Sequence, residues 1–226
     1  MVFVTGDMHG DLTRYKDKGI KRLKKNDYLI ICGDFGFVWN NSSEELKARK
    51  KIASKKFTTL FLEGLNENFE LLESFPEAQF CGGRARKIDE NIYMLRFGEI
   101  YNISGKSFFC LSGGDPDDGE DYSQNIRITP EEITAAVKNL ENSEMKVDYI
   151  LSHDAPASLK EFLGVEEIAF GYLSELLDKI MKTAEYGRWF FARYHTDKPI
   201  SKKLCSVFKE VHPLIDTYEG KKKYTK

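Results

Sequence analysis

Short apolar runs recur along the chain, and most of them end at Gly, Asp or His. Runs of this length that are rich in β-branched and aromatic residues are typical of core strands. They predict eight strands, at Val2–Thr5, Tyr28–Cys32, Thr58–Leu62, Ile92–Leu95, Glu99–Ile103, Ser107–Leu111, Val147–Leu151 and Trp189–Ala192. The stretches between them predict five helices, at about Leu12–Lys25, Ser43–Lys55, Asn68–Ser74, Pro130–Asn142 and Gly171–Tyr186.

The order of these elements indicates an α/β fold. Strands and helices alternate in the first half, which is typical of parallel βαβ units, whereas residues 92–111 carry three consecutive strands, which is typical of an antiparallel meander. The residues leave open two sheets or one mixed sheet, covered by helices. No linker-like change in composition interrupts the chain, so we expect one domain over residues 1–218 and a frayed, Lys-rich tail over residues 219–226.

Composition narrows the class of protein. Of the 226 residues, 41% are hydrophobic and 31% charged, and the formal net charge is −2, which is typical of a soluble globular protein. This charge argues only weakly against a nucleic-acid partner. We expect a cytoplasmic protein with no membrane partner, because no stretch reaches membrane-spanning length and the N-terminus lacks a basic leader. The four cysteines lack CxxC spacing, which predicts free thiols.

Acidic and imidazole side chains collect directly after five predicted strands. They are Asp7 with His9, Asp34, Asn66 with Glu67, His153, and Arg193 with His195. Because ligands bind outside the carboxyl ends of strands in α/β sheets, we expect these side chains to converge. Each Asp taken alone is better explained as a turn or cap residue, but the combination favours a site. We interpret the remaining histidine, His212, as structural.

The spacing within these motifs indicates a metal site. Residues i and i+2 of an extended chain point to the same face, so Asp7 and His9 can chelate one ion, and Arg193 and His195 are predicted to point at one spot. Mixed carboxylate and imidazole ligands suit Mn, Fe or Zn. Asp34 carries two oxygens and can bridge a pair of ions. The acidic segment 111–121 lacks EF-hand spacing, and we expect an exposed loop near the crevice.

These motifs resemble those of the calcineurin-like metallophosphoesterase family. "GDMHG", "GDFG", "GLNENF", "SHDAP" and "ARYH" are similar, in order, to its Asp-x-His, Gly-Asp, Gly-Asn-His-Glu, single-His and Gly-His-x-His blocks. The resemblance implies two packed mixed β-sheets flanked by helices, in a four-layer α/β/β/α sandwich. It also implies that Asp7, His9, Asp34 and His195 hold a first metal ion, and that Asp34 and His153 contribute to a second.

The chain departs from the family pattern at three positions. Aligned without a gap, Leu65 replaces the Asn ligand, Asn66 the general-acid His, and Arg193 the second-metal His of the last block. Leu65 has no lone pair and Arg193 keeps its proton, so we expect one ion rather than two. Arg193 either binds phosphoryl oxygens in place of an ion, or pairs with an acid or points to solvent. In a third alternative the loop shifts by one residue, so that Asn66 coordinates and Leu65 turns into the core.

The leading hypothesis is a metal-dependent phosphoesterase that attacks a phosphomonoester or phosphodiester with a metal-activated water. It gives catalytic roles to Asp34, Asn66 and Arg193, metal binding to Asp7, His9, Asp34, His153 and His195, and substrate binding to His153 and Arg193. The expected substrate is a phosphorylated small molecule or a nucleotide, and hydrolysis is expected to be slow because Asn66 cannot act as a general acid. The alternative is a catalytically inactive protein that binds phosphate or nucleotide.

Overall fold

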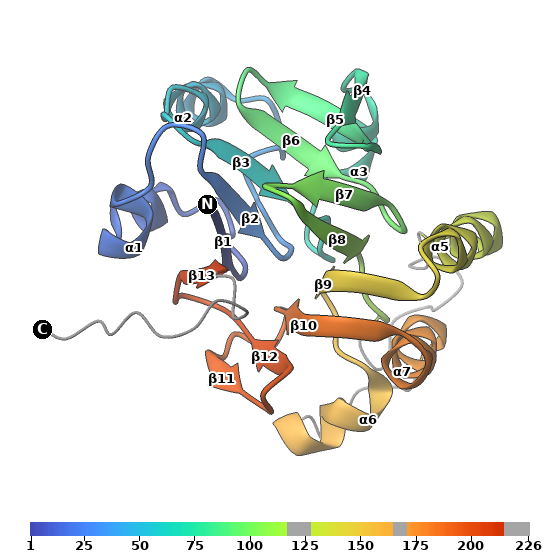
Figure 1. Ribbon diagram of the computed structural model, residues 1–226. Helices are drawn as coiled ribbons and strands as arrows, with labels where there is room; N and C mark the ends of the chain where they lie inside the picture. Colours follow the sequence, from blue (N-terminus) through green and yellow to red (C-terminus); the bar gives the residue numbers. More distant parts are fainter. Residues whose placement is uncertain (117–127, 165–170, 215–226) are drawn as a thin grey trace, which may run out of the picture.

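Two mixed β-sheets lie face to face in the computed structural model, which describes residues 1–116, 128–164 and 171–214 (Figure 1). One sheet, called sheet A, has the order β13 (His212–Leu214), β1 (Val2–Thr5), β2 (Tyr28–Ile31), β3 (Thr58–Phe61), β6 (Ile92–Leu95), β5 (Gly83–Asp89) and β4 (Glu77–Phe80). The other, sheet B, has the order β11 (Lys198–Pro199), β12 (Leu204–Ser206), β10 (Glu185–Phe191), β9 (Lys146–Ser152), β8 (Lys106–Leu111) and β7 (Ile100–Ile103).

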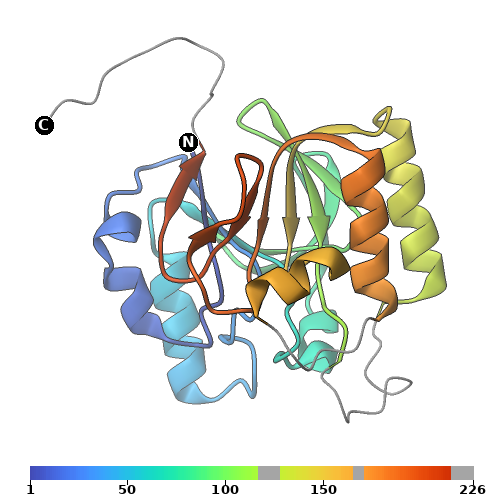
Figure 2. The same ribbon diagram turned by 90° about the horizontal axis from the view of Figure 1, so that it is seen from below.

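Helices lie on the outer faces of the two sheets and beside the ends of their strands. They are the 3₁₀ helix η1 (Leu12–Lys16), α1 (Lys18–Lys21), α2 (Ser43–Ala53), α3 (Phe69–Glu73), α5 (Pro130–Asn142), α6 (Ala157–Lys160), the 3₁₀ helix η2 (Glu161–Leu163) and α7 (Tyr172–Thr183). Figure 2 shows α1 and α2 on one side of the two sheets and α5 and α7 on the other. The predicted sandwich of two mixed sheets flanked by helices is therefore confirmed.

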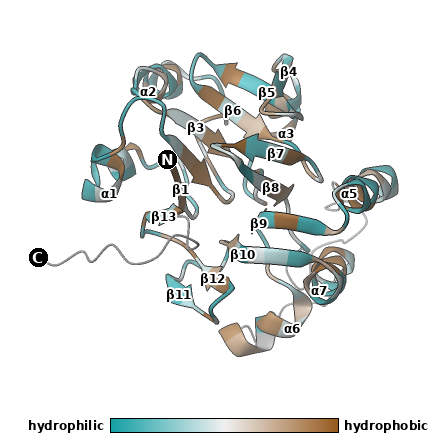
Figure 3. Cartoon of the chain, viewed as in Figure 1, coloured by the Kyte–Doolittle hydropathy of each residue, from teal (hydrophilic) through white to brown (hydrophobic). Residues whose placement is uncertain are grey.

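Three hydrophobic cores hold the layers together, because the central strands are buried on both faces. Along β2, Leu29 and Ile31 pack toward the helices of sheet A, whereas Ile30 packs between the sheets. Along β10, Phe190 packs between the sheets and Trp189 packs toward α5 and α7. Figure 3 accordingly shows β1 and β2 largely brown, whereas α2 and α5 carry many teal residues. Burial on both faces explains why these strands read as continuous apolar runs.

The predicted three-strand meander is wrong, because its strands belong to different sheets. β6 lies in sheet A between β3 and β5, and β7 and β8 lie in sheet B. Both edges of β6 are thus already paired, and none remains for β7. The prediction also missed the hairpin of β4 and β5, whose polar residues alternate with half-buried ones at the edge of the sheet. Strands β11, β12 and β13 were missed because they are only two or three residues long.

Two predicted helices differ from the structure. The segment 12–25 forms η1 and the one-turn α1, because Asp17 between them has an extended backbone with ψ of 145°. The last helix stops at Thr183, and the chain then enters β10 at Glu185. The helix at Pro130 is confirmed over Pro130–Asn142, with the reciprocal capping box between Thr129 and Glu132.

The acidic segment after β8 is not an exposed loop over its described part. Asp115 is buried, and its oxygens accept hydrogen bonds from the backbone N–H groups of Leu173 at 2.9 Å and Ser174 at 3.0 Å. It thereby caps α7, whose own N-cap, Gly171, has no side chain to do so. The buried ammonium of Lys160 lies 3.3 Å from Asp115. Residues 117–121 of this segment lie outside the described residues.

Other expectations concern single residues and the ends of the chain. The four cysteines are free, as predicted. His212 lies in β13 and pairs with β1, which fits a structural role. Among the described residues, no helix is long and apolar enough to span a bilayer. The boundary at residue 218 and the tail 219–226 fall outside the described residues, so both stay predictions.

Replacing Asp115 tests whether it anchors α7. We expect Asp115→Asn to lower the free energy of unfolding by about 2–4 kcal/mol, because Lys160 then loses the charge of a buried partner. Urea denaturation measures the change. The control is Asp89→Asn at the partly exposed end of β5, for which the expected change is within about 0.5 kcal/mol. Equal effects of the two substitutions would contradict this role for Asp115.

Candidate active site

The loops that follow β1 and β2 are joined backbone to backbone. The carbonyl oxygen of Asp34 accepts hydrogen bonds from the N–H groups of Met8 at 3.1 Å and His9 at 2.8 Å, and Gly10 donates to the carbonyl of Phe35 at 3.1 Å. These bonds hold the first two motifs together at the carboxyl ends of two parallel strands. The convergence predicted from the strand order is therefore present in this part of the site.

Asp7, His9 and His195 bring one ligand atom each to within 4.8 Å of one another. The two histidine Nε2 atoms are 2.9 Å apart, and His195 Nε2 lies 3.2 Å from Asp7 Oδ2. Nitrogen ligands that bind one ion at about 2.0–2.1 Å lie roughly 3 Å from each other. The spacing therefore suits ligands of a single divalent ion.

The carboxylate of Asp7 is buried, and neither oxygen accepts a hydrogen bond from the described residues. His153 Nδ1 comes to 3.5 Å from Oδ1, at a distance where it acts by charge. Burial raises the pKa of Asp7, but His153 and His195 outweigh burial and hold the pKa well below its usual range. A buried, ionised carboxylate without hydrogen-bond donors is a ligand suited to a cation.

Asp34 is held from two sides. Its carboxylate accepts hydrogen bonds from the backbone and side-chain N–H groups of Asn66, both at 2.9 Å, and its Oδ2 lies 3.7 Å from His9 Nδ1. Glu67 accepts a hydrogen bond of 2.6 Å from the N–H of Phe35 and so fixes the loop. Burial raises the pKa of Glu67 to about 8. Asp34 thus lies beside the three-residue cluster, while Asn66 occupies both of its oxygens.

His153 is fully buried between the two aspartates. Its Nδ1 lies 3.1 Å from the carbonyl oxygen of Cys32, and its Nε2, 4.0 Å from Asp34, has no hydrogen-bond partner among the described residues. Burial lowers the pKa of His153, but Asp7 and Asp34 outweigh burial and raise it to about 9. A Cβ at Gly33 would lie 1.9 Å from His153 Nδ1, so only glycine leaves room for this imidazole.

The donor set fits a divalent metal. It combines buried carboxylate oxygens that lack partners, imidazole nitrogens at ligand spacing, and an unpartnered nitrogen on His153. His9, Asp34, Arg193 and His195 all adopt left-handed backbone conformations, with φ of 48°, 41°, 57° and 49°. Such conformations cost about 1–3 kcal/mol each in non-glycine residues and cluster at functional sites.

Arg193 and His195 do not point at one spot, so the prediction from extended geometry is wrong. β10 ends at Phe191, and the positive φ of both residues breaks the two-residue repeat. His195 turns to Asp7, whereas Arg193 Nη1 donates to Asp154 Oδ2 at 2.5 Å. Arg193 thus pairs with an acid, as one alternative predicted, and phosphoryl binding by its guanidinium stays a prediction.

Asp154 is a site residue that the sequence analysis missed. It is fully buried and accepts hydrogen bonds from Arg193, from the hydroxyl of Tyr194 and from the backbone of Asp115, and Lys160 Nζ lies 3.4 Å away. Burial raises the pKa of Asp154, but Arg193 and Lys160 outweigh burial and lower it. Its position directly after His153 was the only available signal.

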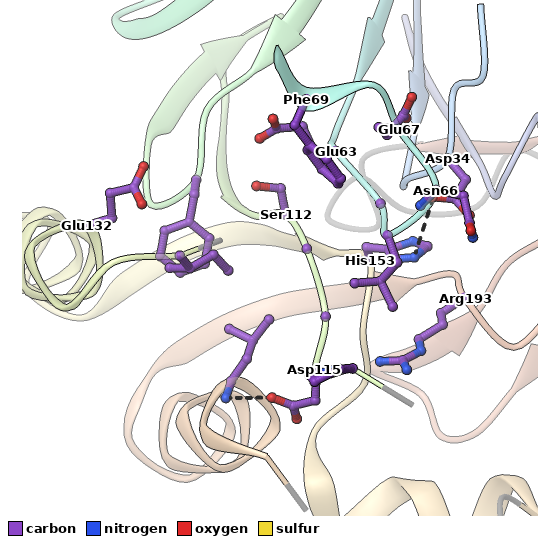
Figure 4. A pocket seen from close by; sticks show the side chains of 18 of the residues that line it. Asp34, Glu63, Asn66, Glu67, Phe69, Ser112, Asp115, Glu132, His153 and Arg193 are labelled. Atoms are coloured by element: carbon purple, nitrogen blue, oxygen red, sulfur yellow. Dashed lines mark hydrogen bonds and ion pairs between the residues drawn. The ribbon is translucent and has the colours of Figure 1, made fainter. Parts of the chain in front are cut away.

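A pocket of about 940 Å³ opens beside these residues. Asp34, Asn66, His153 and Arg193 lie at one end of it in Figure 4, and Glu132 lies at the other. Leu65 is half-buried and lines the pocket, so the alternative in which Leu65 turns into the core is wrong. With Leu65 facing the pocket, this position supplies no ligand atom.

Arg14 and Phe208 hold the three-residue cluster of Asp7, His9 and His195 in place, and neither was predicted from the sequence. The buried guanidinium of Arg14 donates to the carbonyl oxygens of Asp7 and Phe208, both at 2.7 Å. The Phe208 ring packs on the imidazole of His195, with centroids 4.8 Å apart. Arg14 thereby ties the loop that carries Asp7 to the segment that orients His195.

Replacing Arg14 tests this support. We expect Arg14→Lys to weaken Mn²⁺ binding about tenfold, because lysine cannot donate to both carbonyls with the same fork, and loss of such supporting contacts weakens metal binding by about 10- to 100-fold. Calorimetric titration of metal-stripped protein measures the affinity. The control is Arg22→Lys, an exposed arginine that lies over the ring of Phe3. Unchanged Mn²⁺ affinity in Arg14→Lys would refute the supporting role.

Comparison with known proteins agrees with this geometry. The model of the calcineurin-like phosphoesterase family matches residues 1–192, which include Asp7, His9, Asp34 and His153. Comparison with curated proteins returns no match. His195 lies beyond the matched range, yet it completes the three-residue cluster. With most of its length matched and this cluster at the strand ends, the chain belongs to the calcineurin-like phosphoesterase family of metal-dependent phosphoesterases.

Proposed function

We propose that this protein hydrolyses phosphate esters slowly, with one divalent ion, Mn, Fe or Zn, held by Asp7, His9 and His195 beside Asp34. The observation that carries the proposal is the convergence of these three ligands from separate loops around a carboxylate without hydrogen-bond partners. A bound divalent ion supplies a Lewis acid that acidifies water and neutralises phosphoryl charge. The single ion follows from Leu65, which leaves Asp34 and His153 as the remaining ligands of a second site.

The protein's own side chains orient the phosphoryl group. His153 Nε2 is buried at the pocket and has no partner among the described residues, so it is available to bind a phosphoryl oxygen. Arg193 lies in the pocket wall, where Asp154 fixes one of its nitrogens. Its guanidinium neutralises charge that builds on the phosphoryl oxygens. Asn66 fixes the Asp34 carboxylate and has no proton to give to the leaving group.

The alternative is a binding protein without activity that recognises a phosphorylated small molecule or nucleotide. One observation favours it: the side chain beside Asp34 in the pocket is Asn66, an amide with no proton to give to a leaving group. General acid catalysis contributes about 10²–10⁴-fold, and Asn66 cannot provide it. A protein that retains the pocket but lacks these contributions can serve as a receptor for its former substrate.

Metal analysis and an assay on activated esters separate the two functions. We expect about one equivalent of Mn or Fe per chain, and slow turnover of 4-nitrophenyl phosphate or bis(4-nitrophenyl) phosphate, whose leaving group needs no proton. Asp34→Asn is expected to abolish turnover, because the amide cannot supply the carboxylate charge, whereas Asp89→Asn keeps it. Tight nucleotide binding with no turnover of either ester would instead support the binding protein.

Restoring the family residues tests why the site is limited. We expect Leu65→Asn, Asn66→His and Arg193→His together to raise the bound metal from about one equivalent to two and to increase turnover by at least about tenfold. Removing Arg193 leaves the buried Asp154 without the closest of its charged partners, so the triple variant is expected to be less stable. Adding Asp154→Asn removes the carboxylate that lost Arg193, and because Lys160 keeps Asp115 as a partner it is expected to recover part of the thermal midpoint. A folded quadruple variant that still binds one ion would contradict this explanation.

A further inference from the structure

The pocket extends well beyond the residues that would bind a phosphoryl group. Its volume of about 940 Å³ lies at the upper end of the range for small-molecule sites, roughly 300–1,000 Å³. From Asp34 and His153 it runs past Glu63 and Phe69 to the start of α5 (Figure 4). We call the part lined by Phe69, Phe97, Glu63, Arg96 and Glu132 the outer compartment. If a phosphoryl group binds between His153 and Arg193, the outer compartment remains available for the rest of the ester.

Ring-bearing and aliphatic side chains form much of the outer compartment. Phe69 comes from α3, Phe97 from the turn after β6, and Ile133 from α5. Both Phe97 and Ile133 are buried, so these walls are fixed by the cores behind them. Such walls bind a flat ring by apolar contact and stacking.

The polar part of the outer compartment is rich in hydrogen-bond acceptors. Arg96 forms an ion pair with Glu73, and its Nη2 lies 3.7 Å from Glu132 Oε1. Glu73 also pairs with Arg86. Burial lowers the pKa of Arg96, but the nearby glutamates, including Glu63, outweigh burial and raise it. Among the described residues that line the compartment, glutamate carboxylates outnumber the guanidinium of Arg96, and they repel a second anionic group.

We propose that the outer compartment selects the leaving group: a neutral, ring-bearing alcohol of about nucleoside size, whose hydroxyl or amino groups donate to Glu63 and Glu132. This inference rests on the proposed function, since it places the phosphoryl group at His153 and Arg193. An ester with a small or purely apolar leaving group fills the compartment incompletely and forms no hydrogen bonds to these two carboxylates, whose oxygens can each accept more than one. A leaving group that carries a further phosphate would bring that phosphate's negative charge close to the glutamates of the compartment.

Matched esters and one matched pair of variants test the inference. Adenosine 5′-monophosphate and benzyl phosphate both release a primary alcohol, which leaves slowly without a general acid, so their ratio and not their absolute rate is compared. Only the first carries further hydroxyl and amino donors. We expect kcat/KM of the Mn²⁺-loaded protein to be at least about tenfold higher for adenosine 5′-monophosphate, the ratio that one additional good hydrogen bond gives. The kcat/KM for adenosine 5′-diphosphate is expected to be lower than that for adenosine 5′-monophosphate.

Glu132→Gln is expected to reduce the preference for adenosine 5′-monophosphate several-fold while leaving benzyl phosphate unchanged. Glutamine preserves the capping box with Thr129, so α5 keeps its N-terminal cap. The control is Glu131→Gln, which changes the same charge at the neighbouring exposed position, outside this pocket. It is expected to leave the preference intact.

The outcomes separate this inference from the proposed function. Turnover of both esters without preference, or a preference for the diphosphate, overturns the inference and leaves the phosphoesterase in place. If no ester is hydrolysed, calorimetric binding of adenosine that weakens in Glu132→Gln and not in Glu131→Gln supports the compartment while the proposed activity fails. If neither hydrolysis nor adenosine binding occurs, the inference is overturned.

Discussion

The carboxylate of Asp7 lies buried where the two sheets meet, and neither oxygen accepts a hydrogen bond from the described residues. Taking an ionised carboxylate out of water costs several kcal/mol unless opposite charge compensates it. The imidazoles of His195 and His153 stand at 3.2 and 3.5 Å and supply part of that compensation. The site therefore requires positive charge at this point, from protons on the imidazoles or from an ion that replaces them.

The positions of the side chains around the Asp7 carboxylate depend on how the two sheets pack. Asp7 leaves the end of β1 in sheet A, and His153 and His195 leave β9 and β10 in sheet B, so the packing of the two sheets decides their distance. The interface core between the sheets is thus also a determinant of ligand geometry. His195 depends in addition on the segment after residue 192, beyond the part that the family model matches.

Local patterns predicted the strand ends and hence the residues that converge there. Asp7, His9, Asp34 and His153 follow apolar strands, and parallel strands bring their carboxyl ends to one edge whatever their order in the sheet. Contacts set by tertiary packing were not accessible in this way. Nothing in the sequence around Arg14 or Phe208 indicates that they meet behind the metal-ligand candidates. The direction of Arg193 was predicted wrongly because its own backbone is left-handed, which ends the two-residue repeat of β10.

The direction of Arg193 changes the argument for a single ion. A guanidinium at a vacated metal position is expected to repel a cation, but here its charge is compensated by Asp154 at 2.5 Å. Its effect on the pKa of His153 is smaller than that of Asp7 or Asp34. Repulsion by Arg193 is therefore a weak barrier to a second ion. The proposal of a single ion therefore rests on a lack of ligands, because the side chain of Leu65 has no lone pair and Asn66 uses one lone pair on each oxygen of Asp34.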